Sequence, residues 1–392
     1  MTKVFLSPFR NKRITNGHPW IYDNEVKKIE GNFENGDIVE VYDAHKKFIG
    51  KGYINSNSHI LVRILTYQRQ EEINQLFFDK KLKYALDYRL QMGFTQNFRL
   101  VFGEADFLSG LVIDKFGDYL VLQILSLGME KFKPLILESL EKLLKPKGIY
   151  ERNDVPVREM EGLTQQTGFL KPFEIPKNGV EIVENGFKFS VDIVNGQKTG
   201  YFLDQTRNRA TLANFVKGKK VLDCFCHTGS FAIHAAGYGA SHVTALDISE
   251  QAISSAKINA KLNNFEEKID FVCDNAFDWL KESVTENKLF DVVILDPPAF
   301  TKSRANIESA VRGYKEINLR GMKLVKKGGF LITCTCSHFV SNDLFRKTIQ
   351  EAAVDAHRTV REVIFQPQNF DHPILWSVEE SFYLKFYVLQ VL

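Results

Sequence analysis

Two pairs of cysteines stand out as candidates for chemistry in this chain. A single residue separates the members of each pair, so each could in principle form part of a metal site or a disulfide, pack in the core or supply a nucleophile. Cys224 and Cys226 lie in "VLDCFCHTGSF", and Cys334 and Cys336 lie in "TCTCSH"; the chain of 392 residues has five cysteines in all. An odd number argues against a disulfide framework. Structural zinc sites typically use C-x2–4-C spacing, which neither pair has. Two interpretations therefore remain for these thiols, core packing and nucleophilic catalysis.

Four aspartates fall at the ends of apolar, strand-like segments in the second half of the chain: Asp223, Asp247, Asp274 and Asp296. From about residue 186 such segments alternate with helical ones, which predicts a doubly wound parallel sheet. Ligands of these sheets bind outside the carboxyl ends of the strands. A single aspartate there often only caps the next helix, but four in succession favour a ligand site.

The loop after Asp223 is unsuited to a dinucleotide. A pyrophosphate requires a G-x-G-x-x-G loop, whereas this loop has Gly229 alone, and the acidic residue would face an anion. An oxidoreductase that binds NAD is therefore disfavoured. A cofactor with a cationic end and a ribose suits the site better, with Asp247 accepting hydrogen bonds from the ribose hydroxyls.

The elements that must position these residues divide the chain into three predicted domains. Residues 1–70 read as a small β domain, with strands expected at 38–42, 48–53 and 60–65. Residues 71–185 read as a compact α+β domain, with helices expected at 71–93 and 129–148. Residues 186–392 contain the alternating strands and helices and the candidate chemistry.

Composition predicts a soluble cytoplasmic protein with reduced thiols and no membrane partner. Hydrophobic residues make up 44% and charged residues 25% of the chain, and the net charge is +3. This charge is too small to name nucleic acid as the partner by itself. Near the start, Arg10, Arg13 and Trp20 combine basic and aromatic groups that suit RNA binding, although the core of a small barrel has the same pattern.

Several motifs resemble those of class I S-adenosylmethionine methyltransferases: "VLDCFCHTGSFAIHAA", "ALDIS", "DNAFDWL" and "LDPPAF". The segment "GQKTGYFLDQTRNR" (196–209), together with "TCTCSH", resembles the bacterial large-subunit rRNA (cytosine-C5) methyltransferases. The resemblance covers essentially the whole chain. It implies a Rossmann-like methyltransferase domain preceded by a small β-barrel PUA domain and a central α+β domain.

The resemblance also implies a set of residues that bind S-adenosyl-L-methionine. Asp223, Phe225 and Gly229 would line its methionine end, Asp247 would hold the ribose, and Asp274 and Asn275 would contact the adenine edge. Phe202, Asp204 and Gln205 would border the same site. The implied partner is 23S rRNA or a large-subunit precursor, with no metal; the oligomeric state does not follow from the sequence.

Methylation at carbon 5 of cytosine explains why a thiol is needed. A thiolate added at carbon 6 makes carbon 5 nucleophilic, which splits one difficult step into two. In related enzymes the nucleophile lies in a Thr-Cys-Ser triplet, which Cys336 matches, so Cys334 is expected to be a packed core thiol. Asp296 is expected to hydrogen-bond the base. The "DPPAF" motif has no second cysteine to assist product release. His338 is a candidate acceptor for the proton on carbon 5 only because it lies close to Cys336 in sequence.

Two rival interpretations remain open. The same fold could modify a nitrogen atom, for which the "DPP" motif is also typical and a cysteine is unnecessary. Alternatively, the chain could be an RNA-binding assembly factor with a vestigial cofactor site.

Overall fold

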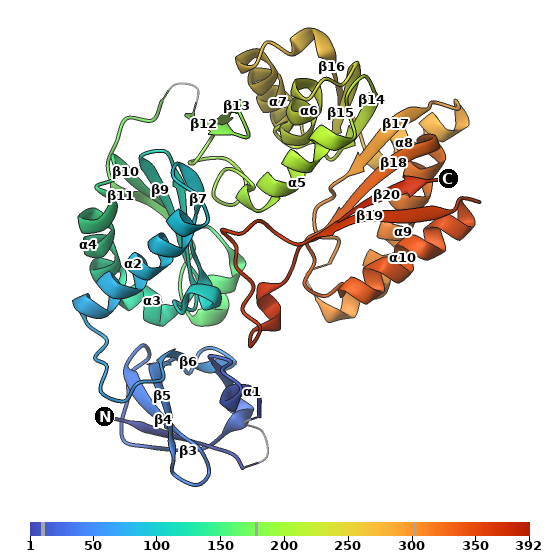
Figure 1. Cartoon of the computed structure of the whole chain (residues 1–392). Coiled ribbons are helices and arrows are strands. Elements are labelled where there is room, and N and C mark those ends of the chain that lie inside the picture. The colour runs from blue at the N-terminus through green and yellow to red at the C-terminus, as the bar shows by residue number, and fades with distance from the viewer. Residues whose placement is uncertain (9–11, 177–178, 302) are drawn as a thin grey trace. The chain divides into compact units, whose positions relative to one another are not determined.

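The computed structural model (Figure 1) describes residues 1–8, 12–176, 179–301 and 303–392. The chain forms two compact units. The first contains Met1–Ile182, Val191–Leu203 and Phe370–Ser381. The second contains Val183–Ser190, Asp204–Asn369 and Phe382–Leu392. The domain boundaries predicted after residues 70 and 185 stay predictions, because the two compact units are not continuous in sequence and do not correspond to the three predicted domains.

The chain begins with a six-stranded sheet of order β2-β6-β5-β4-β1-β3. Its elements are β1 (Lys3–Leu6), α1 (Lys12–Thr15), β2 (Trp20–Tyr22), η1 (Asp23–Glu25), β3 (Val26–Glu30), β4 (Ile38–Tyr42), β5 (Phe48–Ile54) and β6 (Ile60–Thr66). The three predicted strands match β4, β5 and β6 to within one residue. Alternating side chains such as Val39 and Val41 are fully buried, as expected for strands with one face on a core.

The middle of the chain forms a five-stranded sheet of order β11-β10-β9-β8-β7, with α2 packed against α4. The elements are α2 (Gln75–Gln91), β7 (Asn97–Phe102), η2 (Gly103–Asp106), β8 (Leu111–Phe116), β9 (Tyr119–Ile124), α3 (Leu127–Lys131), α4 (Lys133–Leu144), β10 (Gly148–Asn153), η3 (Pro156–Glu161) and β11 (Gln166–Lys171). The single helix predicted at 129–148 is wrong. It is two helices that meet at Phe132, and Pro134 lies in the first turn of α4, where its missing N–H costs nothing.

The second unit is built on a seven-stranded sheet of order β16-β15-β14-β17-β18-β20-β19 (Figure 1). Its strands are β14 (Lys220–Cys224), β15 (His242–Asp247), β16 (Ile269–Cys273), β17 (Phe290–Leu295), β18 (Val325–Thr335), β19 (Val360–Gln366) and β20 (Lys385–Val391). The hairpin β12 (Val180–Glu184) and β13 (Phe187–Val191) precedes them. The first five strands of the sheet run parallel, and β20 is antiparallel to both of its neighbours.

The connecting helices are η4 (Leu203–Gln205), α5 (Thr206–Ala210), η5 (Thr211–Asn214), α6 (Ser230–Gly237), α7 (Glu250–Leu262), η6 (Glu266–Lys268), α8 (Ala276–Thr285), η7 (Arg304–Asn306), α9 (Ile307–Leu324), α10 (Asn342–Asp355) and η8 (Glu379–Ser381). In sequence order the chain moves outward from β14 to β16 and then returns to place β17 on the other side of β14. This reversal is a topological switch point, where ligands of α/β sheets bind. The predicted doubly wound sheet is confirmed.

Within the described residues, no helix is long and apolar enough to cross a membrane.

Candidate active site

The predicted acidic residues meet at one edge of the large sheet. Strands β14, β15, β16 and β17 are parallel, and their register aligns Asp223 with Ala245 and Ile294, and Asp247 with Cys273. Because parallel strands end at the same edge, Asp223, Asp247, Asp274 and Asp296 lie at the carboxyl ends around the switch point. The alternation of strands and helices thus positions all four.

The loop between β14 and α6 has an unusual backbone. Phe225, His227 and Gly229 all have positive φ angles, of 63°, 50° and 76°. Two of these residues carry side chains, for which this conformation is uncommon and costs on the order of 1 kcal/mol or more. Strained backbone of this kind persists where surrounding contacts hold it, and it is concentrated at functional sites.

Hydrogen bonds fix this loop against β15. The N–H of Cys226 donates to the carbonyl of Leu246 over 2.9 Å, and the N–H of His227 donates to Oδ2 of Asp247 over 2.9 Å. A Cβ atom at Gly229 would lie 2.9 Å from Cβ of Ala256 on α7. Glycine is therefore required at 229 both by its φ angle and by the close approach of α7.

Asp223 is a buried ionisable group that forms no ion pair within the described residues, although the charge of Arg209 acts on it from a distance. The residue is fully buried, and within the described residues neither carboxylate oxygen accepts a hydrogen bond of good geometry. Burial, followed by the charge of Asp296, raises the pKa of Asp223 well above its ordinary value. The buried hydroxyl of Thr228 also lacks a partner in this part of the chain. A ligand that carries an ammonium group would satisfy both side chains, so the site fits the methionine end of S-adenosylmethionine.

Three other predicted cofactor residues lie together at the ends of β15 and β16. Oδ1 of Asp247 accepts a hydrogen bond from the N–H of Ser249, and the N–H of Asp274 donates to the carbonyl of Asp247 over 3.1 Å. Asn275 caps α8 by accepting from the N–H of Phe277. Asp247, Asp274 and Asn275 are thus side by side, and their contacts to ribose and adenine stay predictions.

Asp204 and Gln205 lie next to Asp296. Nε2 of Gln205 donates to Oδ1 of Asp296 over 3.0 Å, and the hydroxyl of Tyr383 donates to Oδ2 of Asp204 over 2.5 Å. Phe202, in contrast, belongs to the first unit, where Nζ of Lys198 lies 4.8 Å from its ring centre. The predicted role of Phe202 in the cofactor site stays a prediction.

Asp296 is poised to change protonation near neutral pH. Burial and the charge of Asp204 raise its pKa to about 7, against the opposing effects of Arg209, Cys334 and Gln205. Its backbone N–H points to the carbonyl of Cys224 over 3.4 Å. Asp296 therefore contacts the end of β14 through its backbone, while its carboxyl group interacts with Cys334 of the second cysteine pair.

The two cysteines of "TCTCSH" have different environments. Cys334 lies inside β18, where it pairs with Phe386 and is fully buried, as expected for a packed core thiol. Burial raises the pKa of its thiol well above the ordinary value. Cys336 follows the last residue of β18 and is partly exposed. Of this pair, Cys336 is therefore the residue that is accessible to solvent.

Contacts on both sides of Cys336 hold its backbone. The hydroxyl of Thr335 donates to the hydroxyl oxygen of Tyr314 on α9 over 2.8 Å. The N–H of Ser337 donates to Oγ1 of Thr335 over 3.2 Å, and Oγ of Ser337 donates to the carbonyl of Thr301 over 3.4 Å. Tyr314 is also close enough for the charges of both Cys336 and Asp296 to act on its pKa. The loop and the end of β17 therefore face one tyrosine.

None of the five cysteines, all of which lie in the described residues, forms a disulfide. Cys224 and Cys226 are buried, and burial raises the pKa of both thiols well above the ordinary value. In the described part of the chain, no group of three or more His, Cys, Asp or Glu side chains is arranged to hold a metal ion.

The predicted RNA-binding residues make internal contacts in the first unit. The guanidinium of Arg13 pairs with Glu25 over 3.0 Å and lies 5.0 Å from the ring centre of Tyr22. The indole N–H of Trp20 donates to Oε1 of Glu104 over 2.9 Å. Arg10 lies outside the described residues. These contacts suit a packing role, and RNA binding by the three residues stays a prediction.

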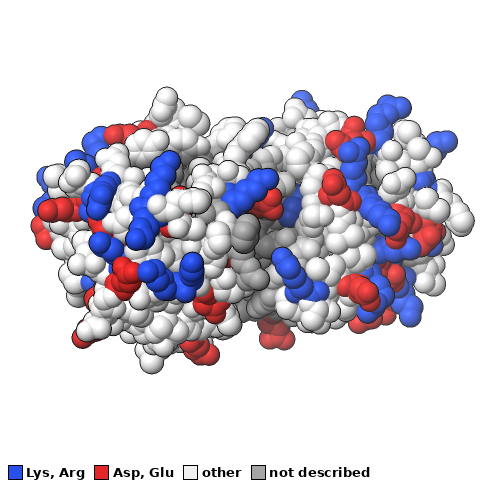
Figure 2. Space-filling view, turned by 90° about the horizontal axis from the view of Figure 1, so that it is seen from below, with Lys and Arg blue, Asp and Glu red and all other residues white. Residues whose placement is uncertain are grey.

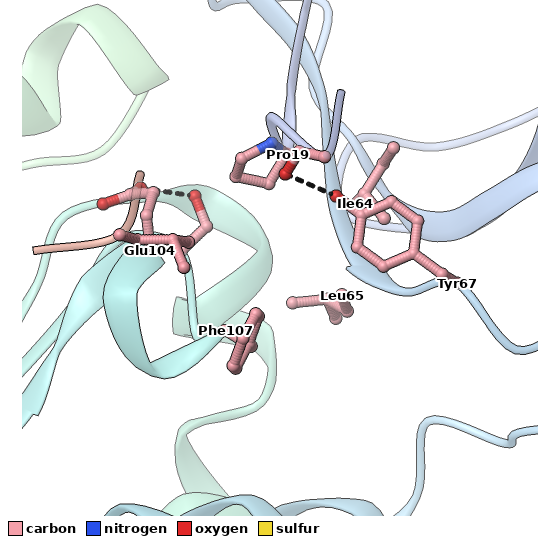
Figure 3. Close-up of a pocket in the computed structure, with 9 residues that line it drawn as sticks. Pro19, Ile64, Leu65, Tyr67, Glu104 and Phe107 are labelled. Carbon is pink, nitrogen blue, oxygen red and sulfur yellow. Dashed lines mark hydrogen bonds between the residues drawn. The ribbon is translucent and has the colours of Figure 1, made fainter. Parts of the chain in front are cut away.

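Figure 3 shows a small cavity beside these contacts, with Pro19, Ile64, Tyr67, Glu104 and Phe107 in its wall. Its volume of about 10 Å³ is enough for a water molecule and far too small for a nucleobase. Figure 2 shows a face of the molecule on which Lys and Arg are interspersed with Asp and Glu. Neither feature marks an RNA surface.

The sequence analysis missed two residues near Cys336. Tyr314 carries no motif that could have revealed it. Lys385 did leave a signal, because it is a lysine at the start of "KFYVLQV", a strand that is otherwise almost entirely apolar. A charged residue in a buried strand is unusual unless it is paired or functional.

Comparisons with known proteins agree with this geometry. A family model for S-adenosylmethionine-dependent methyltransferases matches residues 172–372, and a model for PUA-like domains matches residues 4–67. Ribosomal RNA large subunit methyltransferase I of Aliivibrio fischeri (strain ES114) is 41% identical over 393 residues, which cover 99% of each chain. The protein of the same name from Pseudoalteromonas translucida is 41% identical over 392 residues, with the same coverage.

Two solved structures share the fold over the full length. The SMU.776 protein complexed with SAH has a TM-score of 0.86 and 22% identity, and covers 100% of both chains. A SAM-dependent methyltransferase from Streptococcus mutans has a TM-score of 0.85, the same identity and the same coverage.

Sheet order, acidic residues at the strand ends and family match together define the class: the chain is an S-adenosylmethionine-dependent methyltransferase with an N-terminal PUA-like domain. S-adenosylmethionine is thereby confirmed as its cofactor. Within this class, the chain belongs to the family of ribosomal RNA large subunit methyltransferase I, as its motifs predicted.

Proposed function

We propose that the protein methylates carbon 5 of cytosine in 23S rRNA, or in a large-subunit precursor in the cytoplasm, through a covalent bond from Cys336 to carbon 6. The names of the relatives support the substrate class. The observation that carries the choice of atom is the partly exposed Cys336, which directly follows Thr335, a residue hydrogen-bonded to Tyr314. The charges of both Cys336 and Asp296 act on the pKa of this tyrosine. A methyltransferase directed at nitrogen has no need of a thiol there.

S-adenosylmethionine supplies an electrophilic methyl group when it is bound. The residues that would hold it are Asp223 at its ammonium group, Asp247 at its ribose, and Asp274 with Asn275 at its adenine. The buried carboxylate of Asp223, which accepts no hydrogen bond of good geometry from the described residues, is the strongest support for this orientation, because an ammonium group offers charge and donors.

In the proposed reaction the thiolate of Cys336 adds to carbon 6, which leaves carbon 5 nucleophilic. Asp296, with a pKa of about 7, is available in its protonated form to donate a hydrogen bond to ring nitrogen 3 as charge develops there. Gln205 holds this carboxyl group in place through Nε2. The target base must leave its stack to reach these groups. The PUA-like domain would hold the RNA mainly through its phosphates and shape.

The decisive experiment uses a radiolabelled methyl donor and bulk rRNA that lacks the modification, followed by nucleoside analysis. Wild-type protein, Cys336→Ala and the matched control Cys334→Ala are compared. We expect label in 5-methylcytidine for wild type and control, and none for Cys336→Ala. Label in another nucleoside would overturn the proposal, and so would undiminished labelling by Cys336→Ala.

A further inference from the structure

Lys385 is a buried lysine without an acidic partner. Its side chain lies at the start of β20 and the residue is 2% exposed. Nζ donates to the carbonyl oxygens of Ser337 and Tyr383, each over 3.1 Å. Within the described residues it forms no ion pair with Asp or Glu. Lysines are almost never buried in this way without a counter-charge, so the site must offer one or use the amine.

The strand register places this amine beside Cys336. In the antiparallel pairing of β18 with β20, Lys385 is directly opposite Thr335. Nζ of Lys385 also contacts the carbonyl of Ser337, the residue that follows Cys336. The contacts with the carbonyls of Ser337 and Tyr383 use two N–H bonds of the amine, which leaves its third position to hold or to accept a proton. The cysteine is thus flanked in sequence by two residues that contact or pair with the lysine.

The electrostatics of the site couple the two side chains. Burial lowers the pKa of Lys385 to about 8, and the charge of Cys336 acts in the opposite direction. At this value the amine exchanges its proton close to neutral pH. A cation next to a thiol stabilises its thiolate form, which is the nucleophilic one.

Other ionisable groups near this loop do not replace the lysine. Tyr314 on α9 is hydrogen-bonded to Thr335, and burial raises its pKa to about 12, so it stays neutral. Asp296 at the end of β17 acts on Tyr314 and Cys334 and would disfavour a thiolate. The ring of His338, on the same loop, lies 5.5 Å from that of Tyr383. The thiol of Cys334 is fully buried, and burial raises its pKa.

We propose that Lys385 is the counter-ion of Cys336. The amine of Lys385 accepts the proton of the Cys336 thiol and stabilises the resulting thiolate for attack. The catalytic role of this pair rests on the proposed function, whereas the ion pair between the two side chains does not. In the first step the S–H bond breaks and its proton forms an N–H bond on the amine, giving a thiolate and an ammonium group.

The thiolate then donates a lone pair to form the S–C6 bond, and the C5–C6 π pair becomes available at carbon 5. After methylation, the proton on carbon 5 passes to solvent, its bonding pair restores the double bond, and the S–C6 pair returns to sulfur. The thiolate is again opposite the ammonium group of Lys385, and no oxidant or reductant is required.

The test measures the rate of alkylation of Cys336 by iodoacetamide from pH 5 to pH 10 in the full-length protein, with each cysteine quantified by mass spectrometry. Exposed Cys273 serves as the internal reference. The variants are Lys385→Met, which matches the length of the side chain without its charge, and Lys385→Arg, which keeps the charge. S-adenosylmethionine binding and thermal unfolding establish that each variant is folded.

In Lys385→Met we expect the midpoint of the Cys336 profile to rise by about one pH unit, so that labelling at pH 7 is about tenfold slower. In Lys385→Arg the midpoint stays at or below that of wild type. An unchanged Cys336 profile in folded Lys385→Met overturns the inference. If Lys385→Met does not fold, the test depends on Lys385→Arg, which keeps the positive charge. A midpoint of the Cys336 profile that rises to that of a free cysteine in this variant would also overturn the inference.

These outcomes are independent of the proposed function. If Cys336→Ala still methylates RNA, the covalent mechanism fails, whatever the alkylation profile shows. If Cys336→Ala is inactive but the profile of Lys385→Met is unchanged, the mechanism stands and the role of Lys385 fails.

Discussion

The two C-x-C pairs lie at the ends of β14 and β18, the two strands on either side of β17, and they differ in the environment of the second thiol. Both thiols of the first pair are buried, and burial raises the pKa of each. In the second pair Cys334 is buried, while Cys336 is partly exposed and is followed by Ser337, whose carbonyl oxygen accepts a hydrogen bond from Lys385. Equal spacing in sequence thus gives one structural pair and one pair that contains a reactive candidate.

The backbone explains the difference. After β14 the chain turns through the left-handed residue Phe225, and the N–H of Cys226 bonds to Leu246, which directs the second thiol back into the core. At β18 the strand ends at Thr335, so Cys336 lies just beyond the pleated sheet. The role of a cysteine therefore depends on whether the chain turns inward or leaves the sheet after the first thiol of the pair.

The largest expected effect is a difference in thiol reactivity. Iodoacetamide at pH 7.5 should label Cys336 and exposed Cys273, while Cys224, Cys226 and Cys334 react about a thousandfold more slowly. A buried thiol reacts only through local opening, and an opening free energy of about 4 kcal/mol gives this factor. Mass spectrometry of timed samples measures all five rates. Rapid labelling of Cys226 would remove the proposed distinction between the two pairs.

Next in size is the effect of Asp296, the group between the two pairs. Asp296→Asn should lower kcat about a hundredfold, as for other groups that stabilise developing charge. Because burial raises the pKa of Asp296 to about 7, the protonated donor is lost as the pH rises through 7, and wild-type kcat/KM should carry a fall there.

That fall should be absent in Asp296→Asn, and methyl-transfer rates from pH 5 to pH 9 measure it. Asp291→Asn is the matched control, because Asp291 lies at the other end of β17 and pairs with Lys326. Persistence of the inflection in Asp296→Asn would assign it to another group.

Asp223→Asn tests the cofactor pocket beside the first pair. Loss of a buried charge pair costs about 2 kcal/mol or more, so affinity for S-adenosylmethionine should fall about thirtyfold. The pKa of Asp223 is raised in the folded protein, so its contribution to stability is complete below its ordinary value and is lost as the pH rises through the raised one.

The ligand-free Asp223→Asn variant should therefore lose less stability than wild type between pH 5 and pH 8. Calorimetry gives the affinity and thermal unfolding gives the stability, with exposed Asp270→Asn as the control. Unchanged affinity in Asp223→Asn would remove this residue from the cofactor site.

The smallest effects are expected for the buried thiols. Cys226→Ala and Cys334→Ala should each reduce the free energy of unfolding by about 1 kcal/mol, because they leave small cavities. Their methyl-transfer rates should stay within about threefold of wild type. Chemical denaturation and the nucleoside assay measure the two quantities. A hundredfold loss of activity in Cys334→Ala would show that the second pair acts as a unit.

Local patterns in the sequence were enough to predict much of this molecule. β4 has the predicted bounds, and Asp274 and Asp296 directly follow β16 and β17, because apolar runs that end in a polar residue mark buried strands. The motifs gave the family and the cofactor. The spacing around Cys336 also selected the cysteine that is partly exposed.

Tertiary structure alone decided how the site is assembled. Gln205 meets Asp296 across 91 positions and Tyr383 meets Asp204 across 179, and no local pattern encodes such pairings. The protonation states of Asp223, Asp296 and Lys385 have the same origin, since burial depends on neighbours brought in from distant segments. The sequence by itself determined which chemical groups end the strands. Only the packing of the sheet determined which of these groups are buried, which are paired and which lie close to each other.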